Sequence, residues 1–589
     1  MKTWIIPRIA RGAVVFFKTS AFCIGLSLAD YGAASGKESL SAKTGFLVIA
    51  PDRGFLGNQE TREVMAQFKK DYPASLALLG RDSQGLSGQY DEYLRKAVAE
   101  LEEKGMNEIV AIPLFFSRAD AVLNRFTGKL PSFVKRARLT WTPPLAESYL
   151  AAELLRDRIA ALSNDPSRER LIVIGSGARD EAGEKRIREE LDALTKEAAA
   201  GQPFREIATL VYYERDAEAA LQKKNEEFDN RVIRTAAKPG KTLVIPFAIG
   251  PKFDGHMSLE GWMQRKFGEF DIALGASIIP HPEVLTWLKR SANAHVPAVQ
   301  DKIAVIVMPH GSVQPYNDGL EKVIAPLRKR YHVEMAYGMA DPLVLNEAVQ
   351  TLEREGYKRA VFVRMYALDG HMKAESDYIL GISSHPPGNG HDHGASPGGA
   401  GLPPGARPPR VRTSMLFKTF GGYEEDPATA DILRERILAI SGQAERETVI
   451  LLAHGSGGEQ ENARWLAVMN ANIALIQKKL DRPFKAIKAM ALREDWPELR
   501  EKSLAEIKEE IRKGNENGGA VLLISNRLYG SGPYKEMLSG SEFRMNGQGL
   551  APHPALTRWL EQGIENAIRD MTQTHRIAVS NDSKEKHHE

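Results

Sequence analysis

The sequence predicts an α/β protein of four repeated doubly wound parallel-sheet modules, arranged as two tandem pairs. Apolar strands alternate with amphipathic helices along the chain. Four of these strands, spaced along the sequence, each run into a glycine-containing loop. Such strands are apolar throughout because helices cover both faces of a parallel sheet. A chain of 589 residues is long enough for about three to five domains, each with its own core.

The strands that open the modules read FLVIAPDRGF from 46, LIVIGSGARD from 171, IAVIVMPHGS from 303 and TVILLAHGSG from 448. In each module we expect a helix, a second strand (ASLALLG, EIATLVYY, VEMAYGM, AIKAMAL), a charged helix and a third strand (EIVAIPLFF, TLVIPFAIG, AVFVRMYAL, AVLLISNRL). We assign the four modules to 44–165, 168–292, 302–440 and 446–572. The second and fourth end alike, in PHPEVLTWL from 280 and PHPALTRWL from 552, which indicates duplication of an already duplicated unit.

The two ends of the chain differ from the modules. Residues 1–35 carry basic residues, an apolar run and then small residues, which is typical of an export signal. We therefore expect an exported, periplasmic protein, or a cytoplasmic one if the signal does not function. Residues 573–589 are polar, and we expect them to form a disordered tail.

Composition narrows the function classes. A net charge of +3 gives no basic face of the kind that binds nucleic acid. The single cysteine, Cys23, excludes a disulfide framework and any cysteine-based zinc cluster, so a metal site would use His, Asp or Glu. After the first residues, no segment is apolar enough to span a membrane. A phosphate-binding glycine motif with its lysine is missing from the sequence, so we expect no nucleotide cofactor.

His310 directly follows the first strand of module three, within PHGS, and AHGS recurs in module four. Ligands of open parallel sheets bind beyond the carboxyl ends of the strands. Neutral imidazole binds divalent metals such as Co, Ni, Fe and Zn, and it takes up a proton near neutral pH. Gly311 allows a tight turn, while Ser312 and the helix start behind it offer donors to an anionic group such as a carboxylate.

The loop after the third strand brings a second histidine to this edge. It reads DGHMKAE in module three and DGHMSLE in module two. If a helix begins here, His371 and Glu375 share one face, as do His256 and Glu260. We expect His310 to face His371 across the crevice, with Glu375 as the nearest carboxylate, which raises imidazole basicity or accepts a proton.

A strand ending in HGS, a later ADP that opens a helix, and a strand running into GH resemble the sirohydrochlorin cobaltochelatase family, the class II tetrapyrrole chelatases. The family's two histidines match His310 and His371, and GMADPLVLNEAV from 338 resembles the helix start between them. The resemblance implies flavodoxin-like, chelatase-like modules. It also implies histidines that hold the metal and help remove pyrrole protons as the ion enters the macrocycle.

Only module three keeps both histidines. Module one has Asp52 and Arg53 near the first position, and module two retains His256 but reads IGSGA in place of HGS. Module four retains His454 and has Tyr534 in place of the second histidine. We therefore expect modules one, two and four to be chiefly architectural, with His256, Glu260 and His454 as secondary candidates.

A Pro/Gly-rich segment, 385–409, lies beyond the module-three helix, and its composition predicts a mobile loop. His385, His391, Asp392 and His393 are candidates for collecting a metal ion, and a solvated insertion with incidental histidines is the alternative. His281 and His553, in the two PHP segments, are expected to be structural. Trp287 and Trp559 are expected in the core.

Two functions of different class follow. One is a chelatase-type lyase that inserts a divalent metal, Co²⁺ first and Ni²⁺, Fe²⁺ or Zn²⁺ as alternatives, into a sirohydrochlorin-like tetrapyrrole. The other is an exported, non-catalytic carrier of metal, haem or another tetrapyrrole on the same scaffold. Because modules pair within the chain, we expect a monomer.

Overall fold

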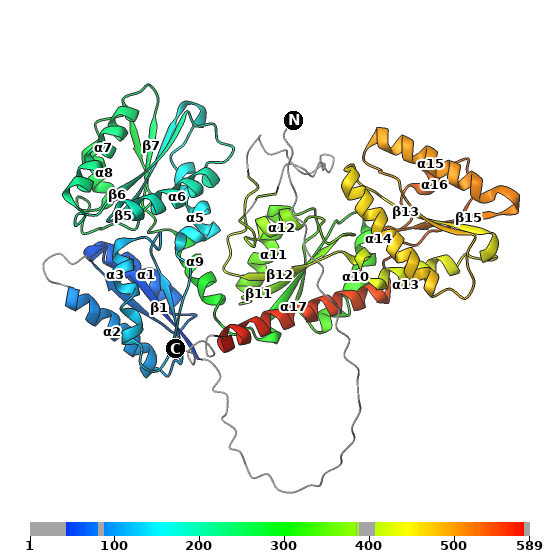
Figure 1. Cartoon of the computed structure of the whole chain (residues 1–589), viewed down its shortest axis with the longest axis horizontal. Helices are drawn as coiled ribbons and strands as arrows, with labels where there is room; N and C mark the ends of the chain where they lie inside the picture. The colour runs from blue at the N-terminus through cyan, green and yellow to red at the C-terminus, as the bar shows by residue number, and fades with distance from the viewer. Residues whose placement is uncertain (1–42, 81–86, 385, 388–406, 582–589) are drawn as a thin grey trace, which may run out of the picture. The chain divides into compact units, whose positions relative to one another are not determined.

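Four four-stranded sheets, all with parallel strands, form the framework of the chain (Figure 1). The computed structural model describes residues 43–80, 87–384, 386–387 and 407–581. The sheet orders are β2-β1-β3-β4, β6-β5-β7-β8, β10-β9-β11-β12 and β14-β13-β15-β16, so one order recurs in all four modules. The predicted α/β class with four parallel-sheet modules is confirmed. The predicted signal segment 1–35 lies outside the described residues.

The strands and helices of the first pair alternate along the chain as follows: β1 (Thr44–Pro51), α1 (Gly54–Phe68), β2 (Ala74–Leu79), α2 (Ser87–Glu103), β3 (Glu108–Pro113), α3 (Ala121–Thr127), α4 (Leu130–Phe133), β4 (Arg138–Trp141), the 3-10 turn η1 (Leu145–Glu147), α5 (Tyr149–Ala160), β5 (Arg170–Ala178), α6 (Glu181–Ala198), β6 (Glu206–Tyr213), α7 (Ala219–Ala236), β7 (Thr242–Pro246), α8 (Leu259–Phe267), β8 (Ile272–Leu274) and α9 (Pro282–Asn293).

The second pair repeats this order: β9 (Ile303–Pro309), α10 (Gln314–Ile324), β10 (Val333–Met335), α11 (Pro342–Arg354), β11 (Arg359–Met365), α12 (Lys373–Ile379), β12 (Leu416–Phe420), the 3-10 turn η5 (Tyr423–Glu425), α13 (Pro427–Leu438), β13 (Glu447–Ala453), α14 (Glu459–Lys478), β14 (Ala486–Ala491), α15 (Pro497–Asn515), β15 (Ala520–Ser525), α16 (Tyr534–Met537), β16 (Arg544–Asn546) and α17 (Pro554–Asn581).

The first and third strands of the modules form the buried centre of each sheet. Every residue of β3, β9, β11 and β13 is buried, as expected for strands covered on both faces. The sequence did not indicate a fourth strand in each module. These strands, β4, β8, β12 and β16, are three to five residues long and only partly buried, so they lack the continuous apolar run by which the others are recognised.

The two modules of each pair share one hydrophobic core, because each lends a helix to the other. In the first pair, α5 follows the module-one sheet but packs on α6, while α9 of module two packs on α1 and α5. In the second pair, α13 packs on α14, and α17 packs on β12 and α10 (Figure 1). Trp287 and Trp559 lie 3% and 7% exposed in these two cores, as predicted.

The PHP segments have the structural role expected of them. His281 precedes α9, and its Nδ1 accepts a hydrogen bond from the backbone N–H of Glu283 at 3.2 Å. His553 precedes α17 and accepts from the backbone N–H of Ala555 at 3.1 Å. α17 continues to Asn581, the last described residue, and so extends into the segment 573–589 for which we expected a disordered tail. Over the described part of the chain, no helix has both the length and the apolar character needed to cross a bilayer.

Candidate functional site

His310 stands on an exposed turn at the carboxyl end of β9. Its Nδ1 lies 2.6 Å from the carbonyl oxygen of Gly311. Gly311 has φ +76°, and a Cβ there would come within 3.1 Å of the Tyr337 side chain, so the position requires glycine. The backbone N–H of Ser312 donates to Oδ1 of Asn317, which fixes the turn against α10. The tight turn expected of the HGS motif is therefore present.

His371 follows β11 and is 9% exposed. Its Nε2 lies 3.0 Å from Oε1 of Glu461, in the first turn of α14 of module four, at ion-pair distance but without the geometry of a hydrogen bond. The expected shared helical face with Glu375 is wrong, because Met372 adopts a left-handed conformation (φ 56°) and α12 begins only at Lys373. The carboxylate in contact with His371 therefore comes from the facing module and not from Glu375.

The indole of Trp465, also on α14, lies against two histidines. The His371 ring meets it edge-on, with centroids 5.3 Å apart and planes at 70°. The His454 ring is stacked on it, at 6.5 Å and 21°. His454 Nε2 in turn lies 3.2 Å from Oδ2 of Asp495. Two histidine–carboxylate pairs thus meet at one aromatic ring, and they come from both modules of the second pair.

His310 is not tied to this group by any polar contact. Among the described residues, no hydrogen bond or ion pair joins His310 to His371, the partner expected across the crevice. The described ranges also hold no cluster of three or more His, Cys, Asp and Glu side chains arranged to bind a metal ion. His385, His391, Asp392 and His393 lie outside the described residues.

A buried carboxyl group stands behind Trp465. Oε2 of Glu424, in η5, accepts hydrogen bonds from Nε1 of Trp465 at 2.8 Å and from Nδ2 of Asn526 at 2.7 Å. Burial raises the pKa of Glu424 to about 8, although the two hydrogen bonds act in the opposite direction. Burial therefore shifts this carboxyl toward its protonated form.

Sequence reasoning missed Glu461, Trp465, Glu424 and Asn526. Three of them lie on helices or turns without a recognisable motif, and their proximity depends on how modules three and four pack. One signal was available: α14 directly follows the AHGS loop and has Glu459 and Glu461 in its first turn.

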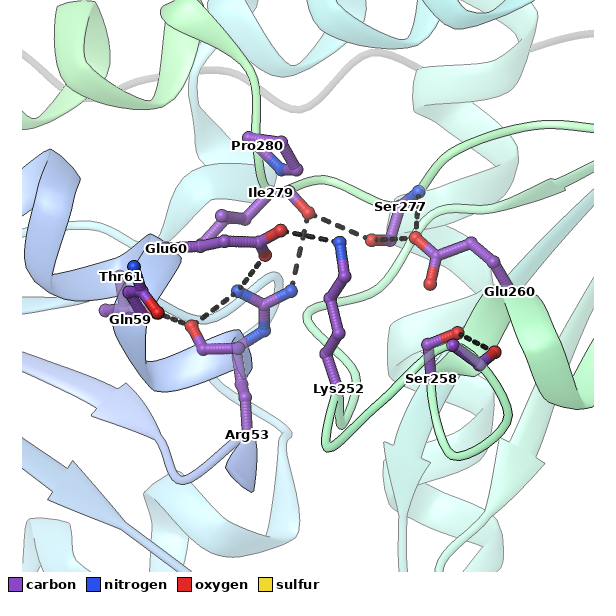
Figure 2. A network of polar contacts seen from close by, with 12 residues as sticks. Arg53, Gln59, Glu60, Thr61, Lys252, Ser258, Glu260, Ser277, Ile279 and Pro280 are labelled. Atoms are coloured by element: carbon purple, nitrogen blue, oxygen red, sulfur yellow. Dashed lines mark hydrogen bonds and ion pairs between the residues drawn. The ribbon is translucent and has the colours of Figure 1, made fainter. Parts of the chain in front are cut away.

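The corresponding edge of the first pair is closed by an arginine. Figure 2 shows the Arg53 guanidinium turned toward Glu60, with Lys252 reaching the same carboxylate. Arg53 is 1% exposed and donates to the carbonyl oxygens of Gly250 (2.9 Å), Gly57 (3.0 Å) and Ile279 (3.4 Å). Burial lowers the pKa of Arg53, and Glu60 opposes that shift. A fixed internal cation thus occupies this edge in modules one and two.

His256 and Glu260 do not form a pair either. α8 begins at Leu259, so His256 precedes the helix, and the expected shared face is wrong. His256 is exposed, and Nη1 of Arg265 donates to its carbonyl oxygen. Glu260 accepts from the N–H and the hydroxyl of Ser277 at 3.0 and 2.5 Å (Figure 2). Burial raises the pKa of Glu260, but the Ser277 hydrogen bonds, a backbone hydrogen bond of Glu260 itself and the charge of Lys252 together leave that pKa below its usual range.

Comparison with known proteins finds no matching family model and no matching curated protein. Among solved structures, the sirohydrochlorin chelatase SirB from Bacillus subtilis subspecies spizizenii in complex with cobalt matches at 14% identity and TM-score 0.31, over 43% of this chain and 94% of that one. SirB from Bacillus subtilis with Fe³⁺ matches at 13% and 0.31, over 46% and 95%.

DR2241 from Deinococcus radiodurans, a multi-domain protein with structural similarity to chelatases and two additional novel domains, matches at 16% identity and TM-score 0.30, over 47% of this chain and 59% of that one. These likenesses are weak, and they show neither a metal nor a substrate for this chain.

Proposed function

We propose that modules three and four insert a divalent metal ion into a sirohydrochlorin-like tetrapyrrole. The observation that carries the proposal is the meeting of two histidine–carboxylate pairs, His371 with Glu461 and His454 with Asp495, at the ring of Trp465. These groups lie where the carboxyl ends of parallel strands meet, which is where such sheets bind ligands. The HGS, ADP and GH motifs of module three, which resemble those of class II chelatases, also support metal insertion.

Insertion needs groups that bind the metal and groups that take protons. The macrocycle supplies four nitrogen ligands, so the protein has to offer only one or two. We assign metal binding to His310 and His371, whose neutral imidazoles suit Co²⁺, with Ni²⁺, Fe²⁺ or Zn²⁺ as alternatives.

Two pyrrole N–H protons leave as the ion enters. We assign their acceptance to the carboxylate of Glu461 and to the imidazole of His371, whose lone pair becomes free for a proton only after it has released the ion to the macrocycle nitrogens. No oxidation or reduction occurs in this step, and no nucleotide is required. Glu375, placed first in the acceptor role by the sequence, is a weaker candidate because the structure puts Glu461 at the imidazole.

Two exposed apolar side chains at helix starts of module three suit the flat faces of a tetrapyrrole. Val313 directly precedes α10 and is 68% exposed, and Leu343 is the second residue of α11 and is 77% exposed. Gly311 and Ser312 offer backbone and hydroxyl donors to the peripheral carboxylates of the macrocycle. We further propose that the histidine-rich segment collects the metal and that the protein acts after export.

The alternative is a carrier that binds metal or tetrapyrrole without turnover. It is favoured by the first pair, in which the buried Arg53 occupies the corresponding edge. Incubating the full chain with Co²⁺ and a large molar excess of sirohydrochlorin separates the two. Pigment conversion that continues far beyond one equivalent of protein supports the chelatase, and conversion that stops at one equivalent supports the carrier.

The matched control for this experiment is His256→Ala, which removes an exposed histidine of the first pair. It should convert pigment at the unmodified rate, while His371→Ala should not convert it.

A further inference from the structure

Glu424 occupies a buried position, where placing a carboxyl group is unfavourable in free energy. Its side chain is buried, and its backbone is held on both sides: the N–H donates to the carbonyl of Ala367 at 3.0 Å, and the carbonyl accepts from Nδ2 of Asn472 at 2.8 Å. Oε2 accepts from Trp465 and Asn526, but within the described residues Oε1 has no hydrogen-bond partner. Among the contacts described for this carboxyl, none is with a cation. Its burial therefore makes the fold less stable than an apolar residue at the same position would.

The indole N–H of Trp465 connects this buried group to the candidate site. Because Nε1 donates to Glu424 at 2.8 Å, the ring has one orientation in its plane. The ring in that orientation contacts His371 at its edge and His454 at its face. Losing the acceptor would free the indole to turn, and both imidazoles would lose the surface against which they rest.

The first pair provides an internal comparison. The second residue of η5 is Glu424, and the second residue of η1 is Ala146. The seventh residue of α14 is Trp465, and the seventh residue of α6 is Ile187, which is fully buried in the core. The pair without the two histidines thus has an alanine and an isoleucine at these places. The carboxyl and the indole occur together only where the histidines do.

We propose that Glu424 is a positioning residue that holds the indole of Trp465 between His371 and His454 and so sets the arrangement of the two imidazoles. This deepens the proposed function and rests on it. Glu424 itself touches neither histidine in any contact described, so it acts through Trp465. Glutamine should replace it, because its side-chain carbonyl oxygen accepts both hydrogen bonds.

The test measures the histidines directly, without metal or macrocycle. The full chain is treated with diethyl pyrocarbonate, and the rates of modification of His371 and His454 are read by mass spectrometry of their peptides. Glu424→Leu and Trp465→Phe, which remove either partner of the hydrogen bond, should each speed modification of His371 severalfold. Glu424→Gln should restore the unmodified rates. Glu283→Gln, which changes a buried carboxyl of the first pair, is the matched control and should leave both rates unchanged.

Unchanged rates in folded Glu424→Leu and Trp465→Phe would overturn the proposal. If Glu424→Leu does not fold, Trp465→Phe and Glu424→Gln decide the question alone. The outcome is separable from the proposed function, because failure of the unmodified chain to convert sirohydrochlorin would leave the modification rates, and hence the positioning role, as measured. Conversely, normal turnover with unchanged rates would refute only the positioning role.

Discussion

Nε2 of His371 lies 3.0 Å from Oε1 of Glu461, across the boundary between modules three and four. The histidine was predicted from the sequence of one module, and its carboxylate partner belongs to the other. Module three alone therefore does not contain all the groups of the candidate site. The facing module contributes the carboxylate beside His371, the ring of Trp465 and the second histidine–carboxylate pair.

Glu461→Gln should lower the rate of metal insertion. It keeps the shape of the side chain and removes the proton acceptor beside His371, and general acid–base groups contribute roughly 10²–10⁴-fold to rates. Single-turnover absorbance changes of sirohydrochlorin with Co²⁺ measure the effect. Glu375→Gln is the matched control and should change the rate less than about threefold, well below that range. A larger effect of Glu375→Gln than of Glu461→Gln would show that Glu375, the residue first predicted, is the proton acceptor.

His371→Ala and His310→Ala should each weaken Co²⁺ binding by tenfold or more, which corresponds to ~1.4 kcal/mol or more. His454→Ala should weaken it less, because His454 is paired with a different carboxylate, Asp495. Isothermal titration of the full chain with Co²⁺ gives the affinities. Metal retained by both module-three variants and lost from His256→Ala would reverse the ranking.

Much of the fold was predictable from the sequence, because β1, β3 and their counterparts are buried on both faces and so are apolar throughout. The fourth strands were not, since three to five partly buried residues leave no pattern. The residues of the candidate site likewise fall into a predictable and an unpredictable group. The position of His310 is predictable, because it depends on a local turn with an obligatory glycine. The partners of His371 depend on the packing of α14 against module three, to which no local motif corresponds.

The pH dependence of stability should change in Glu424→Gln. Burial raises the pKa of Glu424 to about 8, and the nearby Glu425 carboxylate raises it further, whereas in the unfolded chain a glutamate titrates near ~4.3. Between these values the folded chain holds the extra proton, so the free energy of unfolding falls as pH rises and levels off above about 8.

Glutamine has no such proton. The stability advantage of the variant over the unmodified chain should therefore grow by about 2–3 kcal/mol between pH ~6 and pH ~9. Melting temperatures at the two pH values measure this. Parallel curves for the two proteins at both pH values would contradict a raised Glu424 pKa.

Deleting residues 385–404 should reduce metal capture when metal is scarce. The segment is rich in proline, glycine and histidine, a composition suited to collecting an ion and unsuited to a packed core. Conversion of sirohydrochlorin should fall at limiting Co²⁺ and recover at high Co²⁺. A variant with His385, His391 and His393 all changed to serine keeps the length of the segment and removes only its imidazoles. It should lose activity at limiting Co²⁺ as the deletion does. If the deletion variant and the unmodified chain are equally active at limiting Co²⁺, the segment does not collect the metal.

Arg53→Met should destabilise modules one and two and leave the candidate site intact. Methionine fills a similar volume, but three buried carbonyl oxygens lose their donor and Glu60 keeps only Lys252 as its cation. Breaking a buried, hydrogen-bonded ion pair by removing one partner costs about 3–5 kcal/mol.

Hydrogen exchange followed by mass spectrometry locates this loss. Peptides that contain β1 and β5 should exchange faster in Arg53→Met, while those that contain β9 and β13 keep their protection and Co²⁺ affinity stays within about twofold. Arg186→Met is the matched control: its i,i+4 pair with Glu190 involves an arginine side chain that is 64% exposed, so its loss should cost ~1 kcal/mol or less. If Arg53→Met instead removed Co²⁺ binding while β1 and β5 stayed protected, the closed edge of the first pair would be part of the metal site, and the division of labour between the two pairs would have to be reversed.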